Sequence, residues 1–163
     1  MFRKNNTTIG RLWLVCIVLS VAASTSAQDF PAEPDRDMVS LDDKISQFLT
    51  DVAMGETPDA FSALLEGSRL ADQEKPLAAL IERTKQLETK YGKHIDSEQI
   101  AAKRIGKDLV LLKYLYKCEH FPVVWHFAYY RTTNETPSDN GTWRVISVRF
   151  DTELERLWFL HEN

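Results

Sequence analysis

The chain has 163 residues, of which 44% are hydrophobic and 27% are charged, and this length suffices for one globular domain with a buried core. Its net charge of −4 argues against nucleic-acid binding, because attraction to phosphates needs clusters of lysine and arginine. Only two cysteines, Cys16 and Cys118, are present, so a framework of several disulfides is excluded.

Residues 1–27 have the three-part pattern of a secretory signal peptide. The N-terminal segment before residue 12 contains three basic and no acidic residues. Residues 12–23 are largely apolar, and residues 24–27 have small side chains. The apolar run is shorter than the about 20 residues that a membrane-spanning helix needs. We therefore expect cleavage after Ala27 and a secreted or periplasmic protein, with an uncleaved membrane anchor as the alternative.

Cleavage would leave an acidic domain with a single thiol. The removed segment contains three basic and no acidic residues, so 17 basic and 24 acidic side chains remain, a charge of −7. Cys118 then has no internal disulfide partner. We expect it to be a buried small apolar residue or a thiol that pairs between chains. After cleavage we expect the domain to contact neither membrane nor nucleic acid.

Residues 28–37 contain two prolines and several charged side chains, which predicts a linker before a domain that spans residues 38–163. Ser40 and Asp43 have the spacing of a capping box at the start of a helix. The apolar residues that follow recur on one helical face and end before Gly55. They are Leu41, Ile45, Phe48, Leu49 and Val52.

Two further helices are expected before the strands. Thr57-Pro58 has the order of a helix cap and a first helical residue, and Gly67 would end this second helix. A third helix is predicted to begin at Pro76, with Gly92 as its C-terminal cap. Its buried stripe would consist of Leu77, Leu80, Ile81, Thr84, Leu87 and Tyr91.

The second half of the chain changes to the alternating pattern of a half-buried sheet. Asn140-Gly141 is a turn signal before the last strand, and residues 151–163 predict a short helical turn or a docked tail. The fold class is therefore predicted to be α+β, with N-terminal helices packed on a curved, cone-like antiparallel sheet. The predicted strands are 98–106, 108–118, 122–132 and 142–150.

A turn that pairs Cys118 with Val123 would place the large aromatic side chains of the two central strands on one face. A slip by one residue would mix lysines with these aromatics, so we favour the first register. Its cross-strand pairs are Tyr116 with Trp125, Tyr114 with Phe127, and Leu112 with Tyr129, and the last strand would add Ile146, Val148 and Phe150 to the same face.

The opposite face of the predicted sheet is neither clearly polar nor clearly apolar. An exposed, half-apolar sheet face often marks a subunit contact, so a homodimer through this face is a hypothesis. A solvated face with scattered apolar residues is the alternative. The face carries Leu111, Lys113, Leu115, Lys117, Val124, His126, Ala128, Tyr130, Val145 and Arg149.

Two or three N-terminal helices before a strongly aromatic antiparallel sheet resemble the nuclear transport factor 2-like (cystatin-like) superfamily. Residues 106–110, 114–118, 122–131 and 143–146 are similar to segments of small exported bacterial proteins of this superfamily. The resemblance covers about residues 38–155. It implies a helix-covered conical pocket and a tendency to form dimers through the sheet, but the fold hosts enzymes, carriers and interaction subunits alike.

The aromatic face supplies the candidate ligand-binding residues. A tyrosine hydroxyl in an apolar pocket can polarise a carbonyl group, and the resembling superfamily includes ketosteroid isomerases. An isomerase also needs a carboxylate base within reach, and the three clearest strands place no acidic residue on this face. Core aromatics with hydrogen-bonded hydroxyls are the alternative. The candidates are Tyr114, Tyr116, Trp125, Phe127, Tyr129 and Arg131.

The remaining polar residues do not form a recognisable metal or nucleophile motif. Cys118 and His120 share a strand face only if the strand extends that far, and a metal site needs three or four ligands. Arg104 and Arg131, if they point inward, need an acidic partner or an anionic ligand, so Arg131 could hold a ligand carboxylate, but we favour a surface salt bridge. We therefore predict no metal and no cofactor.

Three functions remain open after this reasoning. We favour an exported, non-enzymatic domain that binds a small apolar or amphipathic ligand, or a protein partner, inside the helix-covered sheet. The first alternative is an isomerase- or dehydratase-like enzyme with a pocket tyrosine as electrophile, whose catalytic residues the sequence does not identify. The second alternative is a structural, dimerising subunit whose interior is filled.

Overall fold

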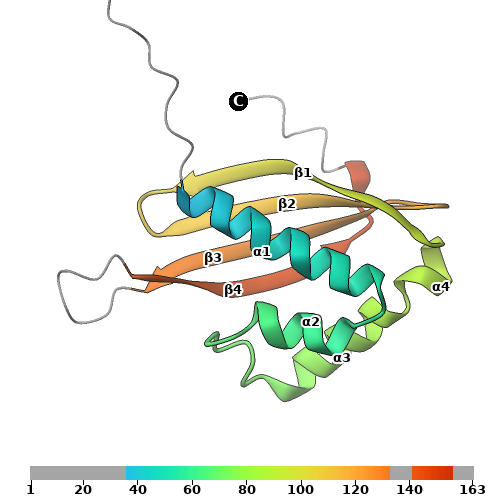
Figure 1. Cartoon of the computed structure of the whole chain (residues 1–163), viewed down its shortest axis with the longest axis horizontal. Helices are drawn as coiled ribbons and strands as arrows, with labels where there is room; N and C mark the ends of the chain where they lie inside the picture. The colour runs from blue at the N-terminus through green and yellow to red at the C-terminus, as the bar shows by residue number, and fades with distance from the viewer. Residues whose placement is uncertain (1–35, 133–140, 156–163) are drawn as a thin grey trace, which may run out of the picture. The chain divides into compact units, whose positions relative to one another are not determined.

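The computed structural model describes residues 36–132 and 141–155, and within them the architecture is α+β, as the sequence predicts. Four α-helices of the described part precede one curved, unclosed antiparallel sheet with the strand order β1-β2-β3-β4 (Figure 1). The predicted signal peptide, residues 28–35 of the predicted linker, the loop 133–140 and the tail 156–163 lie outside the described residues. The elements are α1 (Arg36–Ala53), α2 (Thr57–Leu64), α3 (Glu74–Lys85), α4 (Leu87–Tyr91), β1 (His94–Ile105), β2 (Leu109–Cys118), β3 (Val123–Thr132) and β4 (Thr142–Asp151).

The first helix begins earlier than the capping pattern predicts. α1 starts at Arg36, so Ser40 and Asp43 lie inside the helix and the predicted capping box is wrong. Asp37 stands in the first turn, where a negative charge favours the helix dipole, and its carboxylate also contacts arginines of the sheet. These contacts with the sheet favour a helix that begins at Arg36, and the local sequence does not reveal them. The predicted apolar face is confirmed, since Leu41, Ile45, Phe48, Leu49 and Val52 are all buried.

The next helices follow the prediction with two corrections. α2 includes Thr57 as its first residue, so Glu56 and not Thr57 occupies the cap position, and Pro58 lies in the first turn. The third predicted helix is interrupted at Gln86, which separates α3 from α4. Gly92 ends α4 as expected, with a positive φ of 87° that L-residues rarely adopt.

The sheet pairs in a register that differs by two residues from the predicted one. Tyr114, rather than Tyr116, lies opposite Trp125. The predicted pairing of Cys118 with Val123 is wrong: Tyr116 lies opposite Val123, and Cys118 pairs with His94 of β1. Side chains of a strand alternate with a period of two, so a shift by two residues keeps every side chain on its predicted face.

β4 contains an irregularity that changes which of its side chains faces the core. The register between β3 and β4 shifts at residues 128–129, which leaves Ile146 as the extra residue of a β-bulge. Val145 is therefore 2% exposed and Ile146 is 47% exposed, the reverse of the predicted assignment. Val148 and Phe150 lie beyond the bulge and pack against the core as expected.

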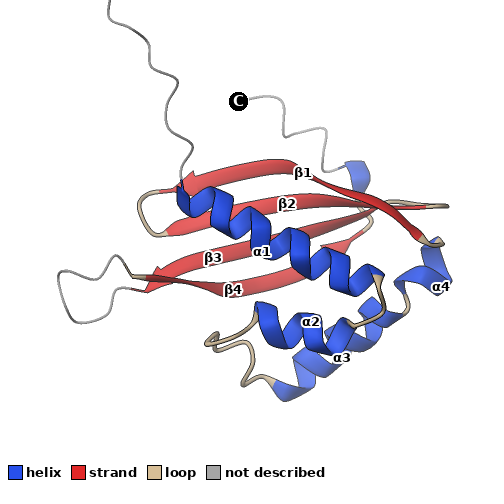
Figure 2. Ribbon diagram, in the orientation of Figure 1, coloured by secondary structure: helices blue, strands red, loops and turns tan. Residues whose placement is uncertain are grey.

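The core lies between one face of the sheet and the helices, and Figure 2 shows α1 running across the sheet. Phe48 of α1 makes edge-on contacts with Phe61, Trp125 and Phe127, at centroid distances of 5.0, 5.3 and 5.8 Å. Trp125 and Phe127 are stacked 5.9 Å apart with an interplanar angle of 12°. The middle of the predicted cone is therefore filled by aromatic rings.

The other face of the sheet is mixed, as the sequence predicts. Val124 is buried on it, Lys113 and Leu115 are half-buried, and Leu111 and Tyr130 are exposed. The homodimer through this face stays a prediction. Within residues 36–132 and 141–155, no helix combines the length and the apolar character that crossing a bilayer requires.

Candidate functional site

The structure separates the six candidate residues that the sequence groups together. Trp125 and Phe127 are 0% and 2% exposed, and both belong to the aromatic core described above. Neither of them lines the two cavities described below. Of the remaining candidates, Tyr129 lines the first cavity and Tyr116 lines the second, so these two tyrosines mark the space that the core leaves open.

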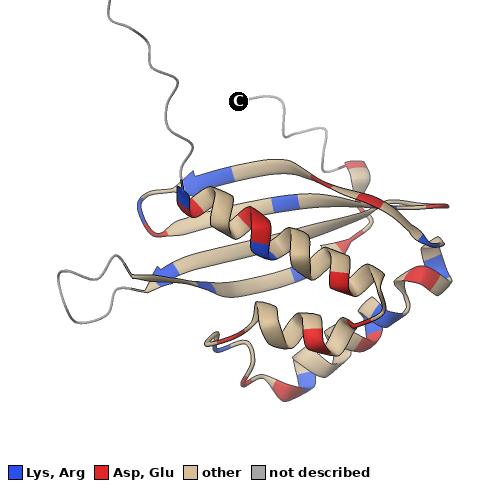
Figure 3. Cartoon of the chain, in the orientation of Figure 1, with Lys and Arg blue, Asp and Glu red and all other residues tan. Residues whose placement is uncertain are grey.

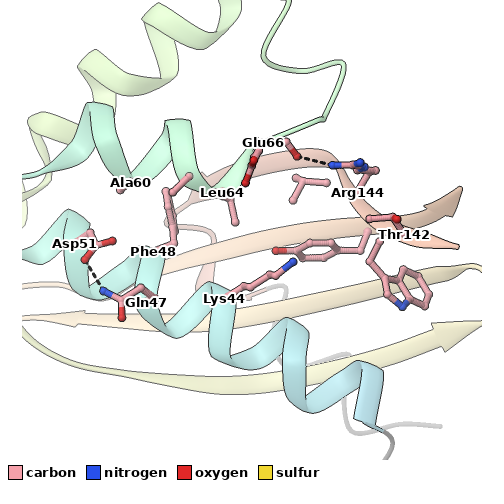
Figure 4. Close-up of a pocket in the computed structure, with 13 residues that line it drawn as sticks. Lys44, Gln47, Phe48, Asp51, Ala60, Leu64, Glu66, Thr142 and Arg144 are labelled. Carbon is pink, nitrogen blue, oxygen red and sulfur yellow. Dashed lines mark hydrogen bonds between the residues drawn. The ribbon is translucent and has the colours of Figure 1, made fainter. Parts of the chain in front are cut away.

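The first cavity, called the α1–α2 cavity, lies between α1, α2 and the adjoining parts of β3 and β4 (Figure 4). Its volume is about 230 Å³. Helix and strand side chains form an apolar wall that includes Phe48, Ala60 and Leu64. The spacing of Lys44 and Phe48 on α1 places an ammonium group one helical turn from this wall. A small ligand with an apolar body and a polar group suits such a surface.

Two polar groups of this cavity are buried without a hydrogen-bond partner. The hydroxyl of Tyr129 and the indole Nε1 of Trp143 make no hydrogen bond within the described residues. Tyr129 is 2% exposed, and burial raises the pKa of its hydroxyl, which therefore stays protonated. A buried hydroxyl or N–H without a partner costs about 1–3 kcal/mol. A bound group that accepts a hydrogen bond would remove this cost.

Charged side chains surround the same cavity. Lys44 forms no ion pair within the part of the chain that the structure describes. Arg144 donates from Nη1 to the backbone carbonyl of Glu66 at 3.0 Å. Asp51 accepts a hydrogen bond of 2.7 Å from the side chain of Gln47, and Figure 4 shows this pair together on α1. The cavity therefore has both cations and anions on its rim. Arg144 and Asp51 are hydrogen-bonded to other groups of the protein, whereas Lys44 has no ion-pair partner among the described residues.

The second cavity, called the α4–β2 cavity, has a volume of about 270 Å³ and lies between the end of α1, the region of α3 and α4, and the strands β1 and β2. Tyr116 and His94 line it, with their ring centroids 4.3 Å apart. The Nε2 of His94 lies 2.9 Å from the hydroxyl oxygen of Ser97. Burial lowers the pKa of His94, while the backbone and carboxylate of Asp96 oppose this shift. The ring is therefore predominantly neutral at pH 7.

Tyr114 lies in neither of these cavities and has a different partner. Its hydroxyl donates to the carboxylate of Asp42 on α1 and accepts a hydrogen bond of 3.1 Å from the amide of Gln99. Burial, followed by the contact with Asp42, raises the pKa of Tyr114. Asp42 is distant in sequence from the strands, so the strand pattern does not predict this carboxylate beside Tyr114.

Arg131 is held in an ionic cluster at the end of the sheet where α1 begins, and Figure 3 shows the mixture of charges in this region. Its Nε donates to Asp108 at 3.1 Å, and its Nη1 lies 3.5 Å from Asp37. Arg104 also contacts Asp37, at 3.4 Å, and both guanidinium groups lie over the ring of Trp143. Both arginines are partly buried and form ion pairs with carboxylates of the chain. The carboxylate that they bind belongs to the protein itself.

The remaining titratable residues do not assemble into a metal centre within residues 36–132 and 141–155, where no group of three or more suitable side chains occurs. Cys118 is buried and unpaired, and burial raises the pKa of its thiol. His120 follows the end of β2 and is exposed. On the other face of the sheet, His126 contacts Asp151 at 3.1 Å.

Comparison of the chain with protein-family models, with curated proteins and with solved structures finds no match. Functional reasoning therefore depends on the geometry described above. Lys44 and Trp143 in the α1–α2 cavity, and His94 in the α4–β2 cavity, were not among the predicted site residues. Trp143 could have been noticed as an aromatic residue at the start of the last strand, whereas the position of a lysine on the polar side of α1 gave no signal.

Proposed function

We propose that this chain is an exported, non-enzymatic domain that binds a small amphipathic molecule in the α1–α2 cavity. The signal-peptide pattern of residues 1–27 supports export to a secreted or periplasmic location. Helices that cover an open antiparallel sheet agree with the proposed relation to the nuclear transport factor 2-like superfamily. The filled aromatic core confines a ligand of this kind to the space beside Phe48, and excludes it from the space between Trp125 and Phe127.

The observation that carries the proposal is the buried hydroxyl of Tyr129, which has no hydrogen-bond partner in a cavity with an apolar wall. Proteins satisfy nearly all buried polar groups, so an unsatisfied group at a cavity is a reason to expect a bound partner. Trp143 presents a second group of this kind on the same cavity. Two unsatisfied groups beside one apolar wall fit a ligand with both an apolar and a polar part.

Binding is favoured over catalysis because the closest tyrosine–carboxylate pair is not in the cavity. Tyr114 and Asp42 bind each other and Gln99, and none of the three lines the α1–α2 cavity. An isomerase of the kind that the sequence analysis considered would need its base within reach of a bound substrate. The carboxylate of Asp51, which does line the cavity, accepts a hydrogen bond from Gln47.

A thermal-shift screen against a library of small metabolites tests the proposal, because a ligand that binds the folded state raises its stability. The protein is expressed from the full-length sequence and purified as the product that the cell releases. Ligands of the α1–α2 cavity should raise the melting temperature of the wild-type protein and of Tyr130→Phe, which changes an exposed tyrosine. The shift should decrease in Tyr129→Phe. A library that produces no shift would overturn the proposal.

A further inference from the structure

We propose that the ligand of the α1–α2 cavity carries a carboxylate group and that Lys44 is its counter-ion. This inference depends on the proposed binding function and specifies its ligand class. It follows from three features of the described residues: the hydrogen-bonding character of the unsatisfied groups, the partners of the charged side chains around the cavity, and the size of the cavity.

The unsatisfied groups of the cavity are suited to an acceptor. The indole Nε1–H of Trp143 and the ammonium group of Lys44 can only donate hydrogen bonds, and the protonated hydroxyl of Tyr129 can donate one. Two donor-only groups and a hydroxyl are complemented by an oxygen that accepts several hydrogen bonds. A carboxylate offers two such oxygens and about four lone-pair positions, and an ionised acceptor makes the stronger hydrogen bonds.

Lys44 is the cation that is available to this carboxylate. Lys85 and Lys117, which lie outside this cavity, have acidic partners: Lys85 contacts Glu82 at 2.8 Å, and Lys117 contacts Glu98 at 2.8 Å. Within the described residues no such partner is found for Lys44. Figure 4 shows its side chain directed from α1 toward the strands that form the opposite wall. Its aliphatic part can cover the apolar wall while the ammonium group stays near the polar groups.

Two acidic residues, Asp51 and Glu66, also line the cavity beside Lys44 and Arg144. Asp51 accepts a hydrogen bond from Gln47, one helical turn away. Glu66 is exposed, and its backbone carbonyl accepts the hydrogen bond from Arg144. Arg144 thus adds a second positive charge at the rim, held in place by the main chain. Lys44 and the unsatisfied donors line the same cavity, and an amine or a cationic ligand would meet Lys44 with the same sign of charge.

The volume of the cavity limits the rest of the ligand. At about 30 Å³ of liquid volume per water, 230 Å³ corresponds to about eight water molecules. This space accommodates a single ring or a short chain beside Phe48, Ala60 and Leu64. The inferred ligand is therefore a small aromatic or aliphatic carboxylate.

Matched probes of the same shape and different charge test the inference. Benzoate, benzamide and benzamidinium carry charges of −1, 0 and +1 on one ring framework, and hexanoate, hexanamide and hexylammonium give an aliphatic counterpart. Each is titrated into the purified protein and followed by NMR chemical shifts and calorimetry. In at least one series we expect the carboxylate to bind about fivefold more tightly than its amide, and the cation to bind most weakly.

Variants identify the counter-ion and separate the two levels of the proposal. Lys44→Gln should remove the advantage of the carboxylate over the amide, while Lys75→Gln, which changes an exposed lysine outside the cavity, should keep it. The advantage should also decrease with salt. If amides bind as tightly as carboxylates, or if Lys44→Gln keeps the difference, the carboxylate inference is overturned and the binding function stands. If no probe of either series binds at millimolar concentration, both are overturned for ligands of this size.

Discussion

The ring of Phe48 on α1 meets the indole of Trp125 on β3 edge-on, with centroids 5.3 Å apart and planes at 81°. This contact joins the first helix to the centre of the sheet, and both side chains are at most 2% exposed. Phe48 also lines the α1–α2 cavity. One residue therefore belongs both to the filled core and to the wall of the proposed binding site.

Trp125→Ala should be strongly destabilising, because it removes a fully buried indole that packs against Phe48, Phe61 and Phe127. Truncation of a large buried aromatic costs about 3–5 kcal/mol in the free energy of unfolding. Urea denaturation followed by circular dichroism measures the change. Tyr130→Ala, on an exposed tyrosine of the same strand, is the control and should change stability by less than about 1 kcal/mol. Equal effects of the two variants would contradict the packing described here.

Val145→Ala should cost more stability than Ile146→Ala, although isoleucine is the larger side chain. The β-bulge turns Val145 into the core and Ile146 toward solvent. Loss of two buried methyl groups costs about 2 kcal/mol, whereas truncation of an exposed side chain changes stability by about 0.5 kcal/mol or less. Chemical denaturation of the two variants, compared directly, decides between the bulged and the regular strand. A larger loss for Ile146→Ala would show that β4 alternates without the bulge.

The bulge illustrates what the sequence can and cannot predict for this chain. The alternation of apolar residues predicts the α+β class, the buried face of α1 and the faces of β2 and β3, because these depend on local periodicity. The position of Ile146 depends on one extra residue in β4, which periodicity alone does not reveal. The predicted register of β2 against β3 was also wrong, because it paired Cys118 with Val123, whereas Tyr116 lies opposite Val123.

The candidate site also combines features that the local sequence predicts with features that depend on tertiary packing. Tyr116 and Tyr129 were predicted as inner-face residues from their strand positions, and they line the two cavities. Whether a tyrosine hydroxyl finds a hydrogen-bond partner depends on residues of α1, which are distant from the strands in sequence. Asp42 binds Tyr114, whereas no described residue binds the hydroxyl of Tyr129. Such pairings between a helix and a strand follow from three-dimensional packing and have no local sequence signal.

The stability of the domain should decrease as the pH falls below 6.5, partly because of His94 and His126. Burial lowers the pKa of both rings from 6.5, against the opposing effect of nearby aspartates. The folded protein keeps the rings neutral at pH values where the unfolded chain takes up protons. Their contribution to stability is therefore complete above pH 6.5 and is lost as the pH falls through the lowered pKa values.

Unfolding free energies at pH 5.5 and pH 8 measure this effect. His94→Asn combined with His126→Asn should reduce the difference between the two pH values, and His120→Asn, which changes an exposed histidine, should leave it unchanged. Carboxylates also change the unfolding free energy at the acidic end of this pH range. The histidine contribution is therefore read from the difference between the variants and the wild-type protein. A double variant with the full wild-type difference would show that other groups determine the pH dependence.

The hydrogen bond from Tyr114 to Asp42 should stabilise the attachment of α1 to β1 and β2. The tyrosine is 2% exposed, and its hydroxyl also accepts a hydrogen bond from Gln99. Tyr114→Phe removes a donor to a charged acceptor, and the expected cost is about 1–3 kcal/mol in the free energy of unfolding. Asp42→Asn should cost less, because an amide oxygen can still accept the hydrogen bond.

A double-mutant cycle with Tyr114→Phe and Asp42→Ala isolates this hydrogen bond from the other effects of each substitution. Residues in direct contact typically show a coupling free energy of about 0.5–3 kcal/mol, and urea denaturation of the four proteins measures it. Tyr130→Phe, on an exposed tyrosine, controls for the loss of a hydroxyl that has no such role. Additive effects in the cycle would mean that Asp42 and Tyr114 act independently. Strong coupling would show that the hydrogen bond between Asp42 and Tyr114 stabilises the fold.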